Sequence, residues 1–461
     1  MTQEEKNKSM GSKVLAWTGR LFSKNRLEEA LGRKVLPRGE DAALEALWNG
    51  IIEGAAPWNN RETPSLMLAP KLCDIAADKV VIEMEAAVSA KASDKASLRA
   101  AFLDVQLQRF LEDARLAVQL LNRRGRLLLK PYVKGNQIHV RVCSCEEYVP
   151  LACNEKGALR SVLFQDRFCS GGRVYTLFEI HEYDEGTFEA SINYLGFVSK
   201  TGGELGVRVP LSEVEAWAEL QDCYSFGGIK SPLFVELVWD GGRPLFHPAI
   251  KALEQADRQY ANILNEYKVG KAKIFASQEL FRRRRDGSLD LKIPDESTYI
   301  KLDSEASDLL SPYLPELRDA ALWQGLNEMK RLIEFNVGLS YGTLSDLNDQ
   351  ARTATELIMN KQNTMIIVGL QQRILRKGLQ ALCTAMDCLA SLYGLVPAGS
   401  WALSVNFGDG IKEDWNDTFA RRLRLVEGGF VDASFVVSEE FSVTAEQAAC
   451  MLPKAADGRA S

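Results

Sequence analysis

The sequence HPAIKALEQADRQYANILNEYKVG occupies residues 247–270, and PELRDAALWQGLNEMKRLIEFNVG occupies residues 315–338. In both stretches apolar residues recur every three or four positions, which predicts two amphipathic helices. Pro248 suits the first turn of the first helix, and Gly338 suits the end of the second. The intervening residues 271–312 lose this spacing and contain short strand-like runs between turn formers. The pattern that decides the fold is therefore a pair of long helices joined by a small β-rich segment.

A polar loop and a still longer helix follow this pair. Residues 339–351 are rich in turn formers, whereas residues 352–393 contain no proline and have glycine only at positions 369 and 378. A helix of that length would span about 63 Å. It predicts either a bend at a glycine or a helix that crosses a large assembly. A strand is expected at 401–407, and two short helical pieces are expected within 414–453.

The N-terminal half predicts helices followed by a β-rich module. Helical spacing runs through residues 26–56, with an interruption near Pro37, and through residues 96–122 as one amphipathic helix. A hairpin is expected around the turn Gly135-Asn136. The fold class is therefore α+β, mainly helical, with a β-rich module at about 125–240. Further strands are expected at 148–152, 159–168, 174–183, 187–197 and 234–239.

Composition narrows the class of protein. The chain has 461 residues, 46% hydrophobic and 26% charged, which indicates a folded protein with room for about two to four domains. Its formal net charge of −6 argues against gripping nucleic acid by bulk charge. Three histidines lower the expectation of a histidine-dependent enzyme, and nine irregularly spaced cysteines indicate free thiols in a reducing compartment. We expect neither a membrane span nor a signal peptide.

Several motifs suggest chemistry that their context does not support. Gly338-Leu339-Ser340-Tyr341-Gly342 matches a nucleophile elbow, but a helix precedes it and no histidine follows residue 247. Neither Gly-rich phosphate-binding motif occurs. Asp346-Leu347-Asn348-Asp349 begins like a calcium loop but lacks its glycine and its distal glutamate. Four cysteines near His139 do not have the spacing of a zinc site, so we expect no metal; they are Cys143, Cys145, Cys153 and Cys169.

Two clusters leave alternatives open. The run Arg282-Arg283-Arg284-Arg285 either contacts DNA phosphates or an acidic partner surface, or forms the solvated tip of a hairpin. A hydrolase or transferase with its site in the β-rich module would need an acid–base group, and the best candidates are Glu179, His181, Glu182 and Asp184. We expect instead that this second cluster marks the exposed face of a strand and the turn after it.

The order of modules after residue 245 resembles the portal proteins of tailed bacteriophages, in particular the type found in long-tailed phages of Gram-positive hosts. The resemblance rests on the paired helices, the polar loop, and a long helix that opens with Thr353-Ala354-Thr355-Glu356. Gly338-Leu339-Ser340 followed by Gly342-Thr343, and the later segment from Val405 to Asp414, are similar to the corresponding family segments. The resemblance covers most of residues 45–450 and is weakest in the β-rich module.

The resemblance implies a subunit with wing, stem, clip and crown parts. The N-terminal wing would be 1–244, the stem helices 245–270 and 313–338, and a small α/β clip 271–312. A tunnel loop at 339–351 and a long wing helix with its strand at 352–413 would follow. A short crown and tail at 414–461 would complete the chain.

The resemblance also implies a function. The chain would form a dodecameric ring at a capsid vertex, act as a channel for DNA packaging and ejection, and have no catalytic residues and no cofactor. Arg282, Arg283, Arg284 and Arg285 would contact a partner or DNA from the clip. A polar loop suits weak contact with sliding DNA. The loop residues expected to face DNA are Ser340, Tyr341, Thr343, Ser345, Asp346, Asn348, Asp349 and Gln350.

The implied partners are further copies of the chain, double-stranded DNA bound without sequence specificity, terminase, head–tail connectors, and the major capsid and scaffolding proteins, with no membrane. The protein would be located in the virion, and in the host cytoplasm during assembly. The alternative within a phage particle is another head–tail adaptor or a minor capsid protein.

Overall fold

The computed structural model describes most of the chain, and it divides the chain into two units, Met1–Asn406 and Phe407–Ser461. The described residues are 22–36, 42–91, 97–270, 273–277, 282–283, 289–290, 298–301, 310–313, 316–346, 354–408, 422–426, 428, 432–434 and 436.

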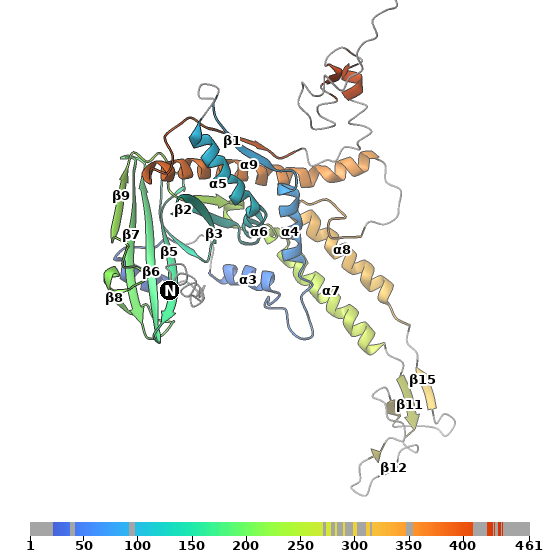
Figure 1. Ribbon diagram of the computed structural model, residues 1–461. Coiled ribbons are helices and arrows are strands. Elements are labelled where there is room, and N and C mark those ends of the chain that lie inside the picture. The colour runs from blue at the N-terminus through green and yellow to red at the C-terminus, as the bar shows by residue number, and fades with distance from the viewer. Residues whose placement is uncertain are drawn as a thin grey trace, which may run out of the picture. The chain divides into compact units, whose positions relative to one another are not determined.

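The described part of the chain mixes helices and sheets, as the α+β expectation required (Figure 1). Both helices of the deciding pair are present, and Gly338 ends the second of them in the left-handed conformation, with φ at 81°. The α-helices are α2 (Lys24–Leu31), α3 (Ala42–Glu53), α4 (Leu68–Val81), α5 (Leu98–Glu112), α6 (Ala114–Arg124), α7 (Ile250–Val269), α8 (Asp319–Val337) and α9 (Ala354–Leu392). Three short 3-10 helices are η1 (Leu211–Glu213), η2 (Asp240–Gly242) and η3 (His247–Ala249).

Strands pair mostly between chain neighbours. The largest sheet has the order β4-β5-β6-β7-β8, with β9 also paired to β7, and a second sheet has the order β10-β2-β3. These strands are β2 (Arg126–Lys134), β3 (Gln137–Ser144), β4 (Tyr148–Cys153), β5 (Leu159–Ser170), β6 (Arg173–Asp184), β7 (Glu189–Ser199), β8 (Val207–Val209), β9 (Cys223–Gly227) and β10 (Val235–Val238). The expected hairpin is confirmed, because Lys134 pairs with Gln137 across the Gly135-Asn136 turn.

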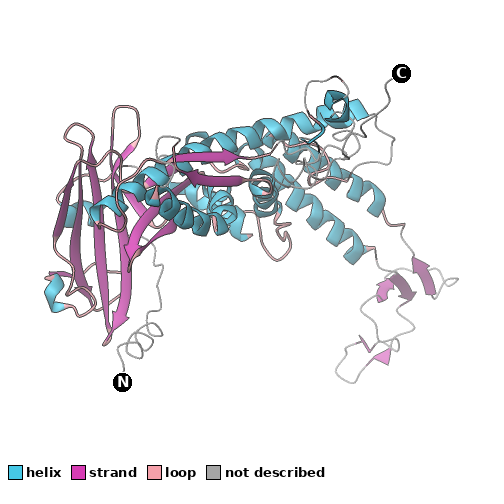
Figure 2. Cartoon of the chain, turned by 45° about the horizontal axis from the view of Figure 1, so that its top comes forward, coloured by secondary structure: helices cyan, strands magenta, loops and turns pink. Residues whose placement is uncertain are grey.

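The six-stranded sheet, drawn in Figure 2, has buried apolar residues on both of its faces. One face packs against the segment 22–36, which contains α2, through a core that includes Phe22, Phe178 and Phe197. Parts of the other face pack in two further clusters, one with Leu128 of β2 and one with Trp217 of the segment after η1. The module is therefore a sheet covered on both sides rather than a sheet with one solvated face.

The expected single helix at 96–122 is wrong, because the segment forms two helices that meet at Asp113. The predicted apolar stripe is also wrong in part. Leu98 and Val105 are exposed, whereas Arg99 and Gln106 of the same helix are buried. Arg99 is buried because its guanidinium donates to the carbonyls of residues 387, 396 and 397 at the end of α9.

The long helix is confirmed as one element, since α9 runs without interruption for 39 residues, or about 59 Å. Gly369 and Gly378 both lie inside this helix. A Cβ at position 378 would lie 2.3 Å from Leu237 Cδ2, so glycine here permits close packing of α9 against β10. The polar chain Gln371–Asn122–Cys73 ties the same helix to α6 and α4, with amide contacts of 2.7 and 3.2 Å.

A two-stranded sheet joins distant parts of the first unit. β1 (Glu85–Ser89) pairs antiparallel with β16 (Ala402–Asn406), which confirms the strand expected at 401–407. The outer edge of β1 is capped by α5, because Val88 N donates to Asp104 and Gln108 donates to the Ala86 carbonyl. These side chains satisfy backbone groups that an open edge would leave unpaired.

The second unit is described only in short pieces, including helical residues 422–426. Most of the two helical pieces expected within 414–453 lies outside the described residues.

Candidate functional site

The pair α7 and α8 lies side by side (Figure 1) and defines the candidate site. Gln259 Nε2 donates to the Leu322 carbonyl at 3.0 Å, and Trp323 Nε1 donates to Tyr267 Oη at 3.0 Å. Near the segment 271–312, Arg318 contacts both carboxylate oxygens of Glu266, at 2.8 and 3.1 Å. This pairing lowers the pKa of Glu266. Because the Arg318 side chain is highly exposed, the ion pair itself contributes little stability.

Each helix of the pair has a buried apolar side as well as exposed apolar residues. The buried apolar side chains are Ala252, Leu253, Ala256 and Ile263 of α7, and Leu326, Ile333 and Val337 of α8. Other large apolar side chains of this region have between 40% and 67% of their surface exposed. These are Leu264, Tyr267 and Val269 of α7, Leu317 just before α8, and Trp323, Leu332 and Phe335 of α8.

The exposed apolar residues occupy more than one side of the pair. At about 100° of rotation per residue, Leu264 lies beside Ile263 on one flank of α7, and Val269 lies on the opposite flank. Phe335 is nine residues after the buried Leu326, which places it about 180° around α8. An apolar patch on more than one side is unusual for a surface exposed to water and indicates contact with other polypeptide.

The start of α7 is anchored to the N-terminal segment through Asp257, which is buried. Its carboxylate accepts from Trp58 Nε1 at 2.9 Å, from Asn59 Nδ2 at 2.9 Å and from Leu66 N at 2.8 Å. No sequence pattern marks this residue, since a lone Asp in a helix is usually solvated. The contact fixes the direction in which α7 leaves the rest of the unit.

The loop after α8 is held at its root by Glu334, whose side chain is fully buried. It accepts from Leu344 N, from Ser345 N at 2.9 Å and from Ser345 Oγ at 2.8 Å. Ser340 Oγ lies 2.6 Å from Thr364 Oγ1 on α9. The segment from Gly338 to Ser345 is therefore bound to both flanking helices.

The predicted loop residues differ in exposure. Ser340 and Ser345 are buried and their hydroxyls are used inside the chain, so these two are poorly placed to meet DNA in this conformation. Thr343 Oγ1 donates to the Ser340 carbonyl, whereas Tyr341 and Asp346 are exposed. Asn348, Asp349 and Gln350 lie outside the described residues. That this loop faces DNA stays a prediction.

The segment between the helices contains the expected short strands. β11 (Lys273–Ser277) pairs with β14 (Thr298–Lys301) in parallel and with β15 (Leu310–Tyr313) antiparallel. β12 (Arg282–Arg283) pairs with β13 (Leu289–Asp290). Arg282 and Arg283 are thus on a strand, while Arg284 and Arg285 lie outside the described residues. Contact of this run with a partner or DNA stays a prediction.

The alternative acid–base cluster is arranged differently from the expectation. The expectation that Glu179 and His181 lie on an exposed face is wrong, because His181 is buried and only 12% of the Glu179 side chain is exposed where β6 faces β2. Glu179 pairs with Lys130 Nζ at 2.5 Å and with His181 Nε2 at 2.6 Å. Glu182 and Asp184 point elsewhere: Glu182 pairs with Arg33, and Asp184 accepts from Gly186 N in the following turn.

Burial and charge pairing set the protonation of this cluster. Lys130 and His181 together lower the pKa of Glu179 to about 2, against the opposing effect of burial. Burial lowers the pKa of His181, because a second positive charge beside Lys130 would be poorly solvated. Glu179 is therefore ionised and His181 neutral at pH 7, and the carboxylate is occupied by its neighbours.

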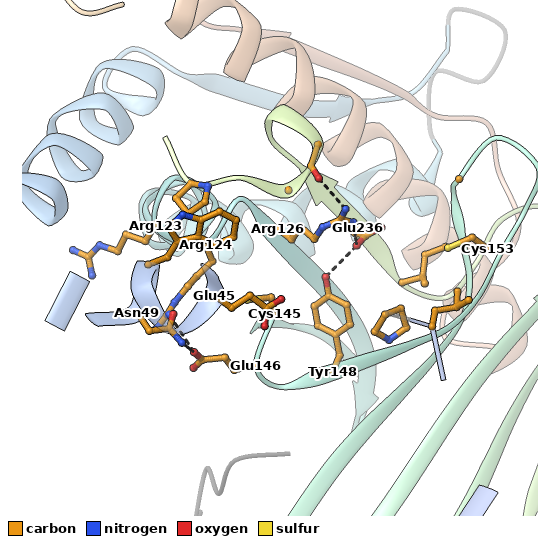
Figure 3. A pocket seen from close by; sticks show the side chains of 18 residues that line it. Glu45, Asn49, Arg123, Arg124, Arg126, Cys145, Glu146, Tyr148, Cys153 and Glu236 are labelled. Atoms are coloured by element: carbon orange, nitrogen blue, oxygen red, sulfur yellow. Dashed lines mark hydrogen bonds and ion pairs between the residues drawn. The ribbon is translucent and has the colours of Figure 1, made fainter. Parts of the chain in front are cut away.

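A pocket of about 190 Å³ lies beside α3, β4 and the start of β2 (Figure 3). It contains three arginines, but each is paired with an acid. Arg123 contacts Asp74 at 2.6 Å, Arg124 contacts Glu146 at 3.1 Å and Arg126 contacts Glu236 at 3.4 Å. Figure 3 shows Tyr148 reaching Glu236 in the same network. The pocket has no excess positive charge with which to select an anion.

The four cysteines that were considered as zinc ligands do not form a metal site. Cys143 is buried, Cys145 is partly buried, and Cys153 and Cys169 are exposed, and none of the four forms a disulfide. Within the part of the chain that the structure describes, no three His, Cys, Asp or Glu side chains could hold a metal ion together. Among the described helices, none has the length and apolar character needed to cross a membrane.

Comparison with known proteins does not assign the chain to a family. No protein-family model and no curated protein sequence matches the chain. A chain from a structure titled as the virion of a native gene transfer agent particle aligns with a TM-score of 0.38 and 11% identity, covering 92% of this chain and 99% of that one. A chain from the neck of an empty gene transfer agent particle, computed with C6 symmetry, aligns with a TM-score of 0.35 and 11% identity, covering 93% and 99%. Scores of this size do not establish a common fold.

Proposed function

We propose that the chain is a structural subunit of a phage-type portal, which assembles into a dodecameric ring at a capsid vertex and lets double-stranded DNA pass. The observation that carries the proposal is the exposure of large apolar side chains on several sides of the α7–α8 pair. The apolar side chains that stay exposed on the pair gain nothing from burial in the isolated chain. Copies of the same pair on either side would remove the remaining apolar surface from water.

A ring requires two different contact surfaces on each subunit, because head-to-tail contacts close by rotation. The α7–α8 pair offers such surfaces, with Leu264 on one flank of α7 and Phe335 on the outer side of α8. The anchoring of α7 through Asp257 supports the same role, since a closed ring needs a fixed direction for the paired helices.

Conduction of DNA needs weak, sequence-independent contact. Each contact between a Lys or Arg side chain and a phosphate strengthens binding by releasing counterions, so a channel benefits from few of them. The net charge of −6 and the polar loop after α8 support this part of the proposal. The rigid root at Glu334 would leave the later part of the loop, rather than Ser340 and Ser345, to approach DNA.

We propose no catalytic role. The Glu179 carboxylate is already occupied by Lys130 and by His181 Nε2, which supports a structural rather than an acid–base function. The work of DNA movement would then come from a separate terminase. The segment 271–312 would dock terminase and later head–tail connectors, and other surfaces would meet capsid and scaffolding proteins.

Matched charge substitutions test the assembly surface. Leu264→Glu should raise the protein concentration needed for assembly at least tenfold, because a carboxylate would be buried in the contact. Asn265→Glu places the same charge on the next residue, which is exposed and polar, and should assemble almost normally. Light scattering after size exclusion measures assembly, and circular dichroism checks folding. Equal assembly of both variants would contradict the proposal.

A further inference from the structure

Arg167 of β5 is a buried arginine without a counter-ion. Its residue is only 8% exposed, and it lies on the sheet face covered by the segment 22–36. Within the described residues no carboxylate comes within ion-pair distance of it. A guanidinium keeps its charge in proteins. Burying it unpaired is costly, and burial accordingly lowers the pKa of Arg167.

The unused part of this guanidinium has a specific geometry. Nη1 donates to the Gly202 carbonyl at 3.2 Å, and the Phe22 ring covers one face, with its centroid 3.8 Å from Cζ. Nε and Nη2 are buried and have no hydrogen-bond partner. These two nitrogens form one edge of the guanidinium, and two parallel N–H donors on one edge match the two oxygens of a carboxylate or phosphate.

Further unsatisfied polar groups lie on the same sheet face. Thr176 pairs directly with Arg167 across β5 and β6, so both side chains point to one side. Thr176 is fully buried and its Oγ1 has no hydrogen-bond partner. Gln165, two residues before Arg167, also carries a buried side-chain oxygen without a partner. Four unsatisfied atoms from three neighbouring residues are more than ordinary packing leaves together.

A second guanidinium adds positive charge nearby. Arg26 of α2 donates to the Gly203 carbonyl, next to the Gly202 carbonyl that Arg167 uses. The acid of that turn, Glu204, is exposed and makes no ion pair with Arg167. The positive charge around residues 202–203 is therefore not neutralised locally by the described residues.

We propose that the Nε–Nη2 edge of Arg167, together with the Thr176 hydroxyl, binds one oxyanion group, either carboxylate or phosphate. The ligand lies between the sheet and the segment 22–36. Because Phe22 packs on the same guanidinium, anion binding stabilises the contact of this segment with the sheet. The site is independent of the proposed ring and of the α7–α8 pair.

Thermal unfolding of the full chain in different salts tests the site. Low-millimolar phosphate should raise the unfolding temperature by about 2–4 °C relative to chloride at equal pH and ionic strength. Chloride is the reference because a spherical ion cannot use both donors as two separate oxygens do. Acetate distinguishes a carboxylate ligand from a phosphate ligand. If acetate also raises the unfolding temperature, a carboxylate is sufficient. If only phosphate raises it, the site needs a tetrahedral anion.

Variants locate the effect. Arg167→Met should abolish the phosphate-induced rise, and Arg167→Lys should reduce it, because Lys keeps the charge but loses the paired donors. Arg141→Met is the matched control, since Arg141 is already paired with Asp166 and Glu147, and should keep the rise. Thr176→Val provides a milder change that should shrink the rise if Arg167→Met fails to fold. No rise in the natural sequence, or an equal rise in Arg167→Met or Thr176→Val, overturns the proposal.

Discussion

Trp58 donates its indole N–H to the carboxylate of Asp257 at 2.9 Å, although the two residues are 199 positions apart. Asn59 and the Leu66 amide donate to the same carboxylate. Replacing one oxygen of a buried carboxylate that accepts three hydrogen bonds lowers the free energy of unfolding more than the same change in an exposed carboxylate. This contact fixes the position and direction of α7, so it affects every proposed contact along that helix.

Asp257→Asn should destabilise the protein by about 2–4 kcal/mol, because the new NH₂ group would face N–H donors. Urea unfolding followed by tryptophan fluorescence measures the loss. Glu254→Gln on the same helix is the control, since Glu254 makes only an exposed pair with Arg258 and should cost less than about 1 kcal/mol. Similar losses for both variants would contradict the anchoring role.

The buried group of Lys130, Glu179 and His181 predicts acid sensitivity in two stages. His181 has a lowered pKa, so the unfolded state binds its proton first and stability falls as the pH drops below about 6.5. Glu179 has a pKa of about 2, lowered from 4.5, so its contribution is complete above 4.5 and is lost between 4.5 and 2. That contribution is about 3 kcal/mol in order of magnitude.

Unfolding temperatures from pH 7 to pH 3 check both stages. His181→Gln should remove the decline that begins near pH 6.5, and Glu179→Gln should remove the decline below pH 4.5 while lowering stability at neutral pH. His139→Gln is the control and should leave the first decline in place. The idea fails if the natural sequence shows no loss of stability between pH 6.5 and 5.

Much of the fold could be predicted where one spacing rule operates over a long segment. α7, α8 and α9 follow helical periodicity, and the hairpin of β2 and β3 follows from the Gly135-Asn136 turn. The division of 96–122 at Asp113 was missed, because its sequence keeps helical spacing on both sides. Tertiary contacts decide that case, since α6 turns to pack against α4 and forms the pairs Arg115–Asp78 and Arg123–Asp74.

Buried polar residues could not be predicted from local pattern. Arg99, Asp257 and Glu334 each face partners distant in sequence or on a following loop, and single-residue polarity favours the surface for all three. His181 and Glu179 were assigned to an exposed face for the same reason. Their burial depends on Lys130, which is 49 residues from Glu179 and lies on another sheet. The candidate loop could be located, but its internal hydrogen bonds could not.

Glu334 predicts a test of the loop root. Glu334→Gln should expose the amides of Leu344 and Ser345 to faster hydrogen exchange, by at least tenfold, because both amides donate to Glu334 Oε1 and a neutral amide oxygen accepts more weakly than a carboxylate oxygen. Exchange measured by mass spectrometry reports on the loop peptide directly. Glu328→Gln on the exposed side of α8 is the control and should leave exchange unchanged. Unchanged exchange in Glu334→Gln would show that the root is held by other contacts.

The arginine run predicts a separation of assembly from docking. Replacing Arg282, Arg283, Arg284 and Arg285 with Ser should leave ring formation intact, because the proposed ring contacts lie on α7 and α8. The same change should lower DNA packaging or tail joining by at least tenfold in an infection assay. A normal infectious yield would contradict a docking role for these four arginines.

Electron microscopy of the purified chain tests the central claim most directly. The account predicts closed rings of about twelve subunits with an open central channel, in which the α7–α8 pairs of neighbouring copies contact one another. A population that stays monomeric at all concentrations, with the exposed face of α8 around Phe335 open to solvent, would contradict it.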